Sequence, residues 1–125
     1  MSMSWTVEKT DGGHKYLRVV SAGRITAEDA QQFSNVIQPG AEHEGVPLLA
    51  YIERGAEYSP QARKMFGEMG GPPGAKRTPM AVVVPSAPLR VLISFILKMS
   101  GLVESTRFFS NEPEAKQWLS TVVDG

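Results

Sequence analysis

The chain has 125 residues, of which 42% are hydrophobic and 21% are charged, as expected for one folded domain with a core. Thirteen basic residues balance thirteen acidic ones, which argues against a nucleic-acid-binding protein. The chain contains no cysteine, which excludes disulfides, thiol chemistry and cysteine-bound zinc and is typical of a cytoplasmic protein.

The first part of the chain predicts an antiparallel hairpin followed by a helix. Residues 4–9 alternate between apolar and polar side chains, which is typical of a half-buried strand. The run Asp11-Gly12-Gly13 favours a turn, and residues 15–20 form the second predicted strand. Thr26 precedes two acidic residues and a helical spacing of apolar residues, so it predicts the N-cap of a helix that ends before Pro39.

The next part predicts strands that alternate with helices. Residues 46–52 and 80–84 are nearly continuous apolar runs, and each favours a strand buried on both faces. Between them, Ser59-Pro60 predicts a helix with Ser59 as its N-cap and proline at the first helical position. Proline residues also precede an apolar helix over residues 88–101.

A strand over residues 104–109 and a helix capped by Asn111 complete the chain. Ala115, Trp118, Leu119, Val122 and Val123 form the predicted inward face of this helix. The order is β-β-α-β-α-β-α-β-α, which predicts a single α/β domain over residues 1–125. Its mixed sheet begins with an antiparallel hairpin and carries packed helices.

Several segments resemble the STAS fold of anti-sigma-factor antagonists and, more closely, the small bacterial SpoIIAA-like proteins, also described as STAS/SEC14-like. These segments are GRITAEDAQQF, VPLLAYIE followed by YSPQARKMF, TPMAVVVPSAPLR, and the ending TRFFSNEPEAKQWL. The resemblance covers nearly the whole chain. It implies a STAS-like, non-enzymatic protein without a cofactor, often dimeric, that binds a ligand or associates with a membrane.

The family's phosphorylation signature is altered in this chain. Partner-switching antagonists carry Asp-Ser-Ser/Thr-Gly where the third strand enters the second helix, and its hydroxyl is phosphorylated. Here the junction is Glu57-Tyr58-Ser59-Pro60, which lacks the acidic neighbour and the glycine. Ser59 is therefore predicted as a helix cap. The alternative is a phospho-acceptor in a partner-switch module.

The apolar helix over residues 88–101 predicts the most distinctive surface. Apolar side chains cover about 240° of its circumference, more than a helix on a sheet needs, and Arg90, Ser94 and Lys98 are expected to face water. The excess would cover the core, a second copy in a homodimer, a hydrophobic small molecule, or the inner face of a membrane bound peripherally from the cytoplasm. The predicted ligand or membrane face comprises Leu92, Phe95, Ile96, Met99, Met65 and Met69.

A polar site is predicted at Glu53, Arg54 and Glu57, which follow the third strand. Ligands of open α/β sheets bind beyond the carboxyl ends of strands. Solvated loop charges are the alternative explanation for these residues. His14 and His43 are not spaced as metal ligands, so neither a metal site nor a catalytic residue is predicted.

Overall fold

The computed structural model describes residues 2–38, 40–43, 45–68, 79–100 and 106–125. Within these residues, five strands form one sheet in the order β1-β2-β4-β6-β7. β1 and β2 are antiparallel, and the other neighbouring pairs are parallel. The strands are β1 (Met3–Lys9), β2 (Lys15–Ser21), β4 (Leu48–Ile52), β6 (Met80–Val83) and β7 (Thr106–Phe109).

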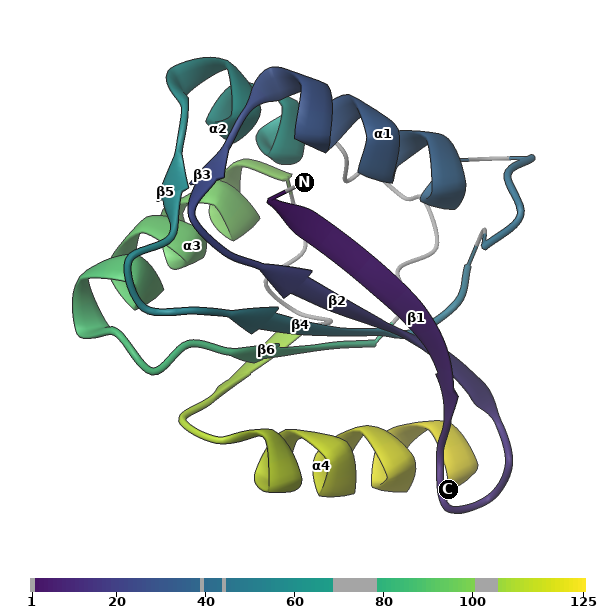
Figure 1. The fold of residues 1–125 in the computed structure, drawn as a ribbon. Helices are drawn as coiled ribbons and strands as arrows, with labels where there is room; N and C mark the ends of the chain where they lie inside the picture. The colour runs from purple at the N-terminus through teal and green to yellow at the C-terminus, as the bar shows by residue number, and fades with distance from the viewer. Residues whose placement is uncertain (1, 39, 44, 69–78, 101–105) are drawn as a thin grey trace.

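Helices cover both faces of this sheet. Figure 1 shows α1, α2 and α3 on one face and α4 on the other. The helices are α1 (Ala27–Ile37), α2 (Pro60–Glu68), α3 (Ala87–Ser100) and α4 (Glu112–Asp124). The predicted α/β class and the mixed sheet with its N-terminal hairpin are confirmed.

Two hydrophobic clusters fill the space between these layers. Alternating residues of one strand contribute to opposite clusters, because successive side chains of a strand point to opposite faces. In β6, Val82 joins the larger cluster under α1–α3, whereas Ala81 and Val83 join the smaller cluster under α4. β4 divides in the same way, with Ile52 in the larger cluster and Leu49 in the smaller one. Burial on both faces explains the continuous apolar runs of these strands.

Two short strands were not predicted. β3 (Arg24–Ile25) and β5 (Glu57–Tyr58) pair in parallel outside the main sheet. Two residues are too few for a recognisable alternation of apolar and polar side chains. The pair is anchored because Ile25 and Tyr58 are both buried in the larger cluster. Residues 104 and 105 of the last predicted strand lie outside the described residues.

The start of α1 confirms the predicted cap. Asp29 N donates to Thr26 Oγ1 at 3.4 Å, and Thr26 N donates to Asp29 Oδ2 at 2.9 Å. This reciprocal arrangement is a capping box that satisfies two backbone donors at the helix end. Asp29 is itself buried, which shields these hydrogen bonds from water.

Replacing Asp29 by alanine is expected to lower the free energy of unfolding by about 1–2 kcal/mol, because it leaves the Thr26 N–H without its carboxylate partner. Urea denaturation measures the change. Glu28→Ala is the matched control, since Glu28 is exposed in the same helical turn. Equal effects of the two substitutions would contradict the capping role.

α4 is fixed to the sheet at its first turn. Asn111 Oδ1 accepts a hydrogen bond from Glu114 N at 3.0 Å, which confirms the predicted cap. Arg18 of β2 donates to both carboxylate oxygens of Glu112, from Nε at 2.9 Å and from Nη2 at 2.8 Å. The prediction that Val122 faces inward is wrong, because its side chain is 43% exposed. The other four predicted residues belong to the smaller cluster or pack against it: Ala115, Trp118, Leu119 and Val123.

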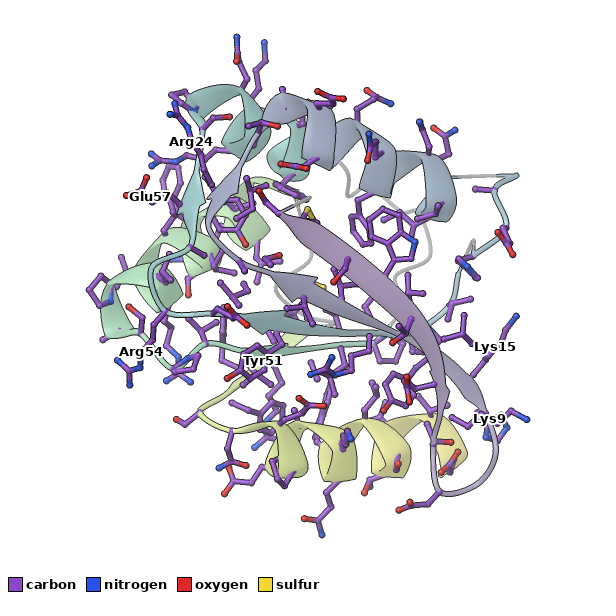
Figure 2. All side chains as sticks on the ribbon, viewed as in Figure 1. Lys9, Lys15, Arg24, Tyr51, Arg54 and Glu57 are labelled. Atoms are coloured by element: carbon purple, nitrogen blue, oxygen red, sulfur yellow. The ribbon has the colours of Figure 1, made fainter. Side chains whose placement is uncertain are left out.

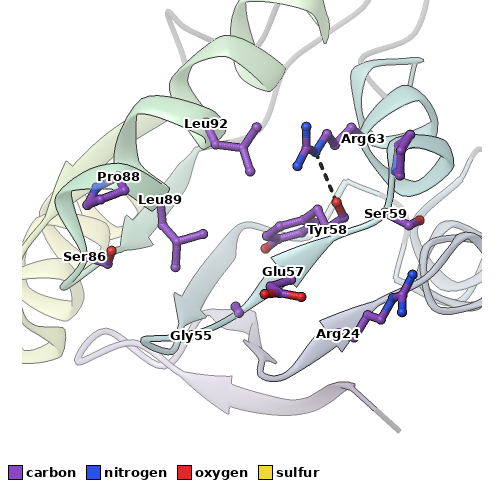
Figure 3. A pocket seen from close by; sticks show the side chains of 12 residues that line it. Arg24, Gly55, Glu57, Tyr58, Ser59, Arg63, Ser86, Pro88, Leu89 and Leu92 are labelled. Atoms are coloured by element: carbon purple, nitrogen blue, oxygen red, sulfur yellow. Dashed lines mark hydrogen bonds between the residues drawn. The ribbon is translucent and has the colours of Figure 1, made fainter.

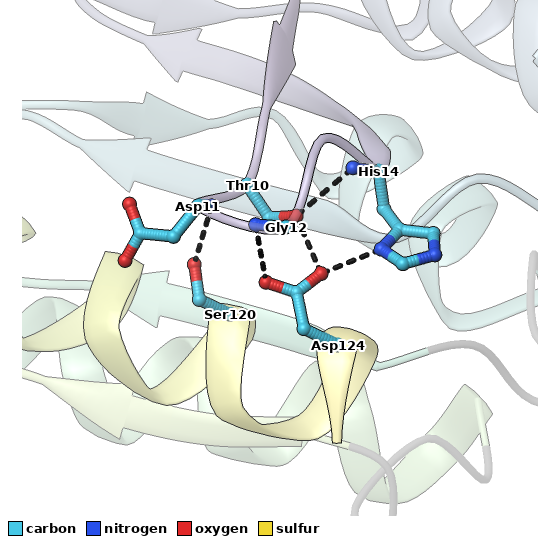
Figure 4. A network of polar contacts seen from close by, with 6 residues as sticks. All are labelled: Thr10, Asp11, Gly12, His14, Ser120 and Asp124. Carbon is cyan, nitrogen blue, oxygen red and sulfur yellow. Dashed lines mark hydrogen bonds and ion pairs between the residues drawn. The ribbon is translucent and has the colours of Figure 1, made fainter.

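The other end of α4 is fastened to the β1–β2 turn (Figure 4). The Asp124 carboxylate accepts from Thr10 Oγ1 at 2.7 Å and from Gly12 N at 2.8 Å, and it contacts His14 Nδ1 at 2.6 Å. The hydrogen bond from Thr10, with smaller contributions from His14 and Gly12, lowers the pKa of Asp124. A Cβ on Gly12 would lie 2.6 Å from Asp124 Cγ, so a side chain at this position would displace the carboxylate. We call this network the hairpin clasp.

Candidate functional site

α3 presents a different face to water than the sequence predicts. Val91 and Phe95 are 72% and 61% exposed, the two most exposed large hydrophobic side chains among the described residues. Lys98 is exposed as predicted, but Arg90 and Ser94 are half-buried. The expected water-facing stripe is therefore wrong at two of its three positions. We call Val91, Phe95 and Lys98 the outer face of α3.

Local contacts explain why two polar residues turn inward. The Arg90 guanidinium lies over the Phe108 ring of β7, 5.6 Å from its centroid. Ser94 Oγ donates to Arg90 O at 2.8 Å, within the helix. The cation–π contact and the internal hydrogen bond allow both residues to pack toward the edge of the sheet.

The residues predicted for the ligand or membrane face are divided between several environments. Ile96 is 5% exposed and belongs to the larger cluster, and Met65 is half-buried against the same cluster. Leu92 is half-buried. Met69 and the side chain of Met99 lie outside the described residues. Of the predicted set, Phe95 lies on the outer face of α3 and Leu92 borders a hollow beside it.

This hollow lies between α2 and α3, beyond the carboxyl ends of β4 and β6 (Figure 3). Its volume is about 640 Å³, within the range of small-molecule sites in proteins. One wall is apolar and comes mainly from the first two turns of α3. Polar and charged groups border the rest. The lining includes Arg24, Glu57, Tyr58, Ser59, Arg63, Ser86, Leu89 and Leu92.

The structure separates the three residues of the predicted polar site. Glu57 borders the hollow. Glu53 and Arg54 are exposed in the loop after β4 and do not belong to its lining, and Figure 2 shows Arg54 extending outward. One residue of the three is thus placed where a ligand of the hollow would contact it.

Two arginines at the hollow were not predicted. Arg24 is on β3, opposite Glu57 in the strand pair, and Arg63 is in the first turn of α2. Arg63 Nε donates to Tyr58 O at 3.1 Å. The spacing of Arg63 four residues after Ser59 was an available signal, since residues four apart share one helix face. Nothing comparable indicated Arg24, because its strand has two residues.

Tyr58 lines the hollow with a buried side chain. Burial raises the pKa of Tyr58 to about 12, and a hydrogen bond with Ser21 opposes that shift. Its ring meets Phe66 edge-on, with the centroids 5.7 Å apart. The phenol therefore stays protonated at neutral pH and serves as a packed wall.

Comparison with known proteins identifies the family. A sequence profile described as SpoIIAA-like matches residues 16–120. The chain belongs to the SpoIIAA-like family. A solved structure with a SpoIIAA-like fold, an uncharacterized protein from Shewanella loihica PV-4, is similar with a TM-score of 0.66 and 16% identity, covering 94% of this chain and 93% of that one. No curated protein matches this sequence.

Ser59 of this SpoIIAA-like chain caps α2, as predicted. Its Oγ accepts a hydrogen bond from Ala62 N at 3.1 Å, and its backbone carbonyl accepts from Arg63 N at 3.0 Å. The hydroxyl oxygen is thus already engaged at the helix end. Phosphorylation of Ser59 stays a prediction.

The described residues also bear on metal binding and membrane crossing in this SpoIIAA-like chain. Among them, no three histidine, cysteine, aspartate or glutamate side chains gather closely enough to hold a metal ion. Their helices include none with the length and apolar character needed to cross a membrane.

Proposed function

We propose that this SpoIIAA-like chain is a non-catalytic binding module that associates peripherally with anionic membranes through the outer face of α3. The observation that carries the proposal is the exposure of Val91 and Phe95 on successive turns of one helix. Large apolar side chains exposed together are typical of an interaction surface.

The surrounding charge favours an anionic partner. The α3 sequence contains no aspartate or glutamate and carries the exposed Lys98 in its last turn. The neighbouring helix α2 adds the exposed Lys64. Each cation near an anionic bilayer contributes about 1 kcal/mol, and an apolar stripe flanked by basic residues is typical of helices that lie on membranes.

The same charges disfavour a second copy of the chain as the occupant. A homodimer through this face would place two basic surfaces together, and like charges across an interface cost free energy. The predicted homodimer and the predicted hydrophobic small molecule remain competing occupants of this face. Vesicle flotation and sedimentation distinguish them from a membrane.

Vesicle flotation tests the proposal. We expect the wild type to float with vesicles of phosphatidylcholine and phosphatidylglycerol, and weakly with phosphatidylcholine alone. Val91→Ser/Phe95→Ser removes two side chains whose burial contributes about 1.5–3 kcal/mol each, so the double variant should bind at least about 100-fold more weakly. Val122→Ser is the matched control, an exposed valine on the opposite layer.

Two outcomes would contradict the proposal. One is a wild type that stays at the bottom of the gradient with both vesicle compositions. The other is a wild type that sediments as a dimer in solution while Val91→Ser/Phe95→Ser sediments as a monomer, because a second copy would then cover this face.

A further inference from the structure

The hollow between α2 and α3 has two chemically different walls (Figure 3). Leu89 and Leu92 provide an apolar wall from α3, and Arg24 and Arg63 provide guanidinium groups from β3 and α2. The Leu92 side chain and the Arg63 head group point toward one another across the space. Val91 and Phe95 do not belong to this lining, so the hollow is a separate surface from the outer face of α3.

The charges of the hollow are incompletely balanced by the protein. Among the described residues, neither Arg24 nor Arg63 forms an ion pair with a carboxylate. Arg63 uses Nε for the Tyr58 carbonyl, which leaves its two terminal amino groups directed away from that bond. Glu57 is exposed beside them and offsets one of the two positive charges. A net positive charge remains at the polar wall.

We propose that this hollow binds the anionic group, a phosphate or a carboxylate, of one small amphiphilic molecule whose apolar part lies against Leu89 and Leu92. Arginine presents paired N–H donors that match the oxygens of either anion. The volume of about 640 Å³ accommodates a short alkyl chain in addition to the anionic group. The Ser86 hydroxyl, at the same rim, offers a further donor.

The decisive probes are soluble molecules that contain one part of this chemistry or both. Hexyl phosphate has the anion and the chain, inorganic phosphate has the anion, and 1-hexanol has the chain. We expect saturable binding of hexyl phosphate in calorimetric titration, with amide shifts near Glu57, Ser59 and Leu89 in NMR spectra. Inorganic phosphate and 1-hexanol should each bind at least about tenfold more weakly.

Three variants assign the binding to the hollow. Arg24→Gln/Arg63→Gln should weaken hexyl phosphate binding at least about tenfold, because two charge-assisted contacts are lost. Glu57→Gln should strengthen it, since a competing negative charge is removed. Lys64→Gln is the matched control: Lys64 is exposed on α2 next to Arg63 but does not belong to the lining. Arg24→Gln alone retains the Arg63–Tyr58 hydrogen bond. It therefore tests whether weaker binding by the double variant comes from a folding defect.

The results show whether both walls of the hollow take part in binding, and they separate the two proposals from one another. Tight binding of hexyl phosphate but not of inorganic phosphate supports an amphiphile, whereas equal affinities overturn the apolar half of the proposal. An equal loss in Lys64→Gln and in the arginine variants overturns the site. These titrations contain no vesicles, so a failure to bind hexyl phosphate leaves the flotation result on Val91 and Phe95 unaffected. A failure to float with vesicles likewise leaves the titration result unaffected.

Discussion

Replacing Leu119 by alanine is expected to lower the free energy of unfolding by about 2–5 kcal/mol, the range for truncating a buried leucine. Leu119 is 0% exposed and lies in the smaller cluster with Leu49 and Val83. That cluster is what holds α4 against its face of the sheet. A domain of this size has about 5–15 kcal/mol of total stability, so this one change removes a large share.

The measurement is urea denaturation followed by far-UV circular dichroism. Val122→Ala is the matched control, because it shortens an aliphatic side chain of the same helix that is 43% exposed. We expect the control to change the unfolding free energy by less than about 1 kcal/mol. Similar losses in the two variants would contradict the assignment of Leu119 as the anchor of α4.

Replacing Arg18 by methionine is expected to cost about 1–3 kcal/mol at pH 7, because it leaves the Glu112 carboxylate partly buried without its two-point partner. Glu112 also contacts Lys116 Nζ at 3.5 Å, which limits the loss. Lys116→Met is the control. It removes the more exposed cation and should cost less than about 1 kcal/mol.

The effect of Arg18→Met should depend on pH in a defined direction. Hydrogen bonds from Arg18 hold the pKa of Glu112 below its ordinary value of 4.5. A carboxyl whose pKa is lowered in the folded state stabilises the protein above its unfolded pKa, and that stabilisation is lost as the pH falls through the folded pKa. The wild type should therefore lose stability on acidification below pH 4.5. The difference in unfolding free energy between the variant and the wild type should narrow over the same range. A difference in unfolding free energy that is constant from neutral to acidic pH would contradict a stabilising role of the Arg18–Glu112 pair.

Much of the fold follows from local sequence signals that the structure confirms. Thr26, Ser59 and Asn111 were predicted as caps because a side-chain oxygen before a helix satisfies its first backbone donors, and each does so here. The continuous apolar runs at residues 46–52 and 80–84 correctly indicated strands buried on two sides. These signals are local, so neighbouring residues suffice to detect them.

The candidate site was harder to predict because it depends on contacts between distant segments. Arg24 reaches the hollow through a two-residue strand whose partner lies more than thirty positions later. Arg90 was expected in water because it is charged, yet Phe108 provides a ring for it to lie against. Phe95 is exposed, whereas Ile96 beside it, predicted for the same face, is buried. A helical wheel gives the angular positions of side chains around a helix. It does not show which side of the helix packs against the sheet.

The hairpin clasp also constrains when the fold can be completed. Its contacts join residues 110 to 114 positions apart in the chain, and the Arg18–Glu112 pair spans 94. During synthesis on the ribosome, the β1–β2 turn therefore has no clasp until α4 has emerged. Until then β1 is held to the sheet by its pairing with β2, and the face of β4 and β6 that α4 will cover is open to chaperones.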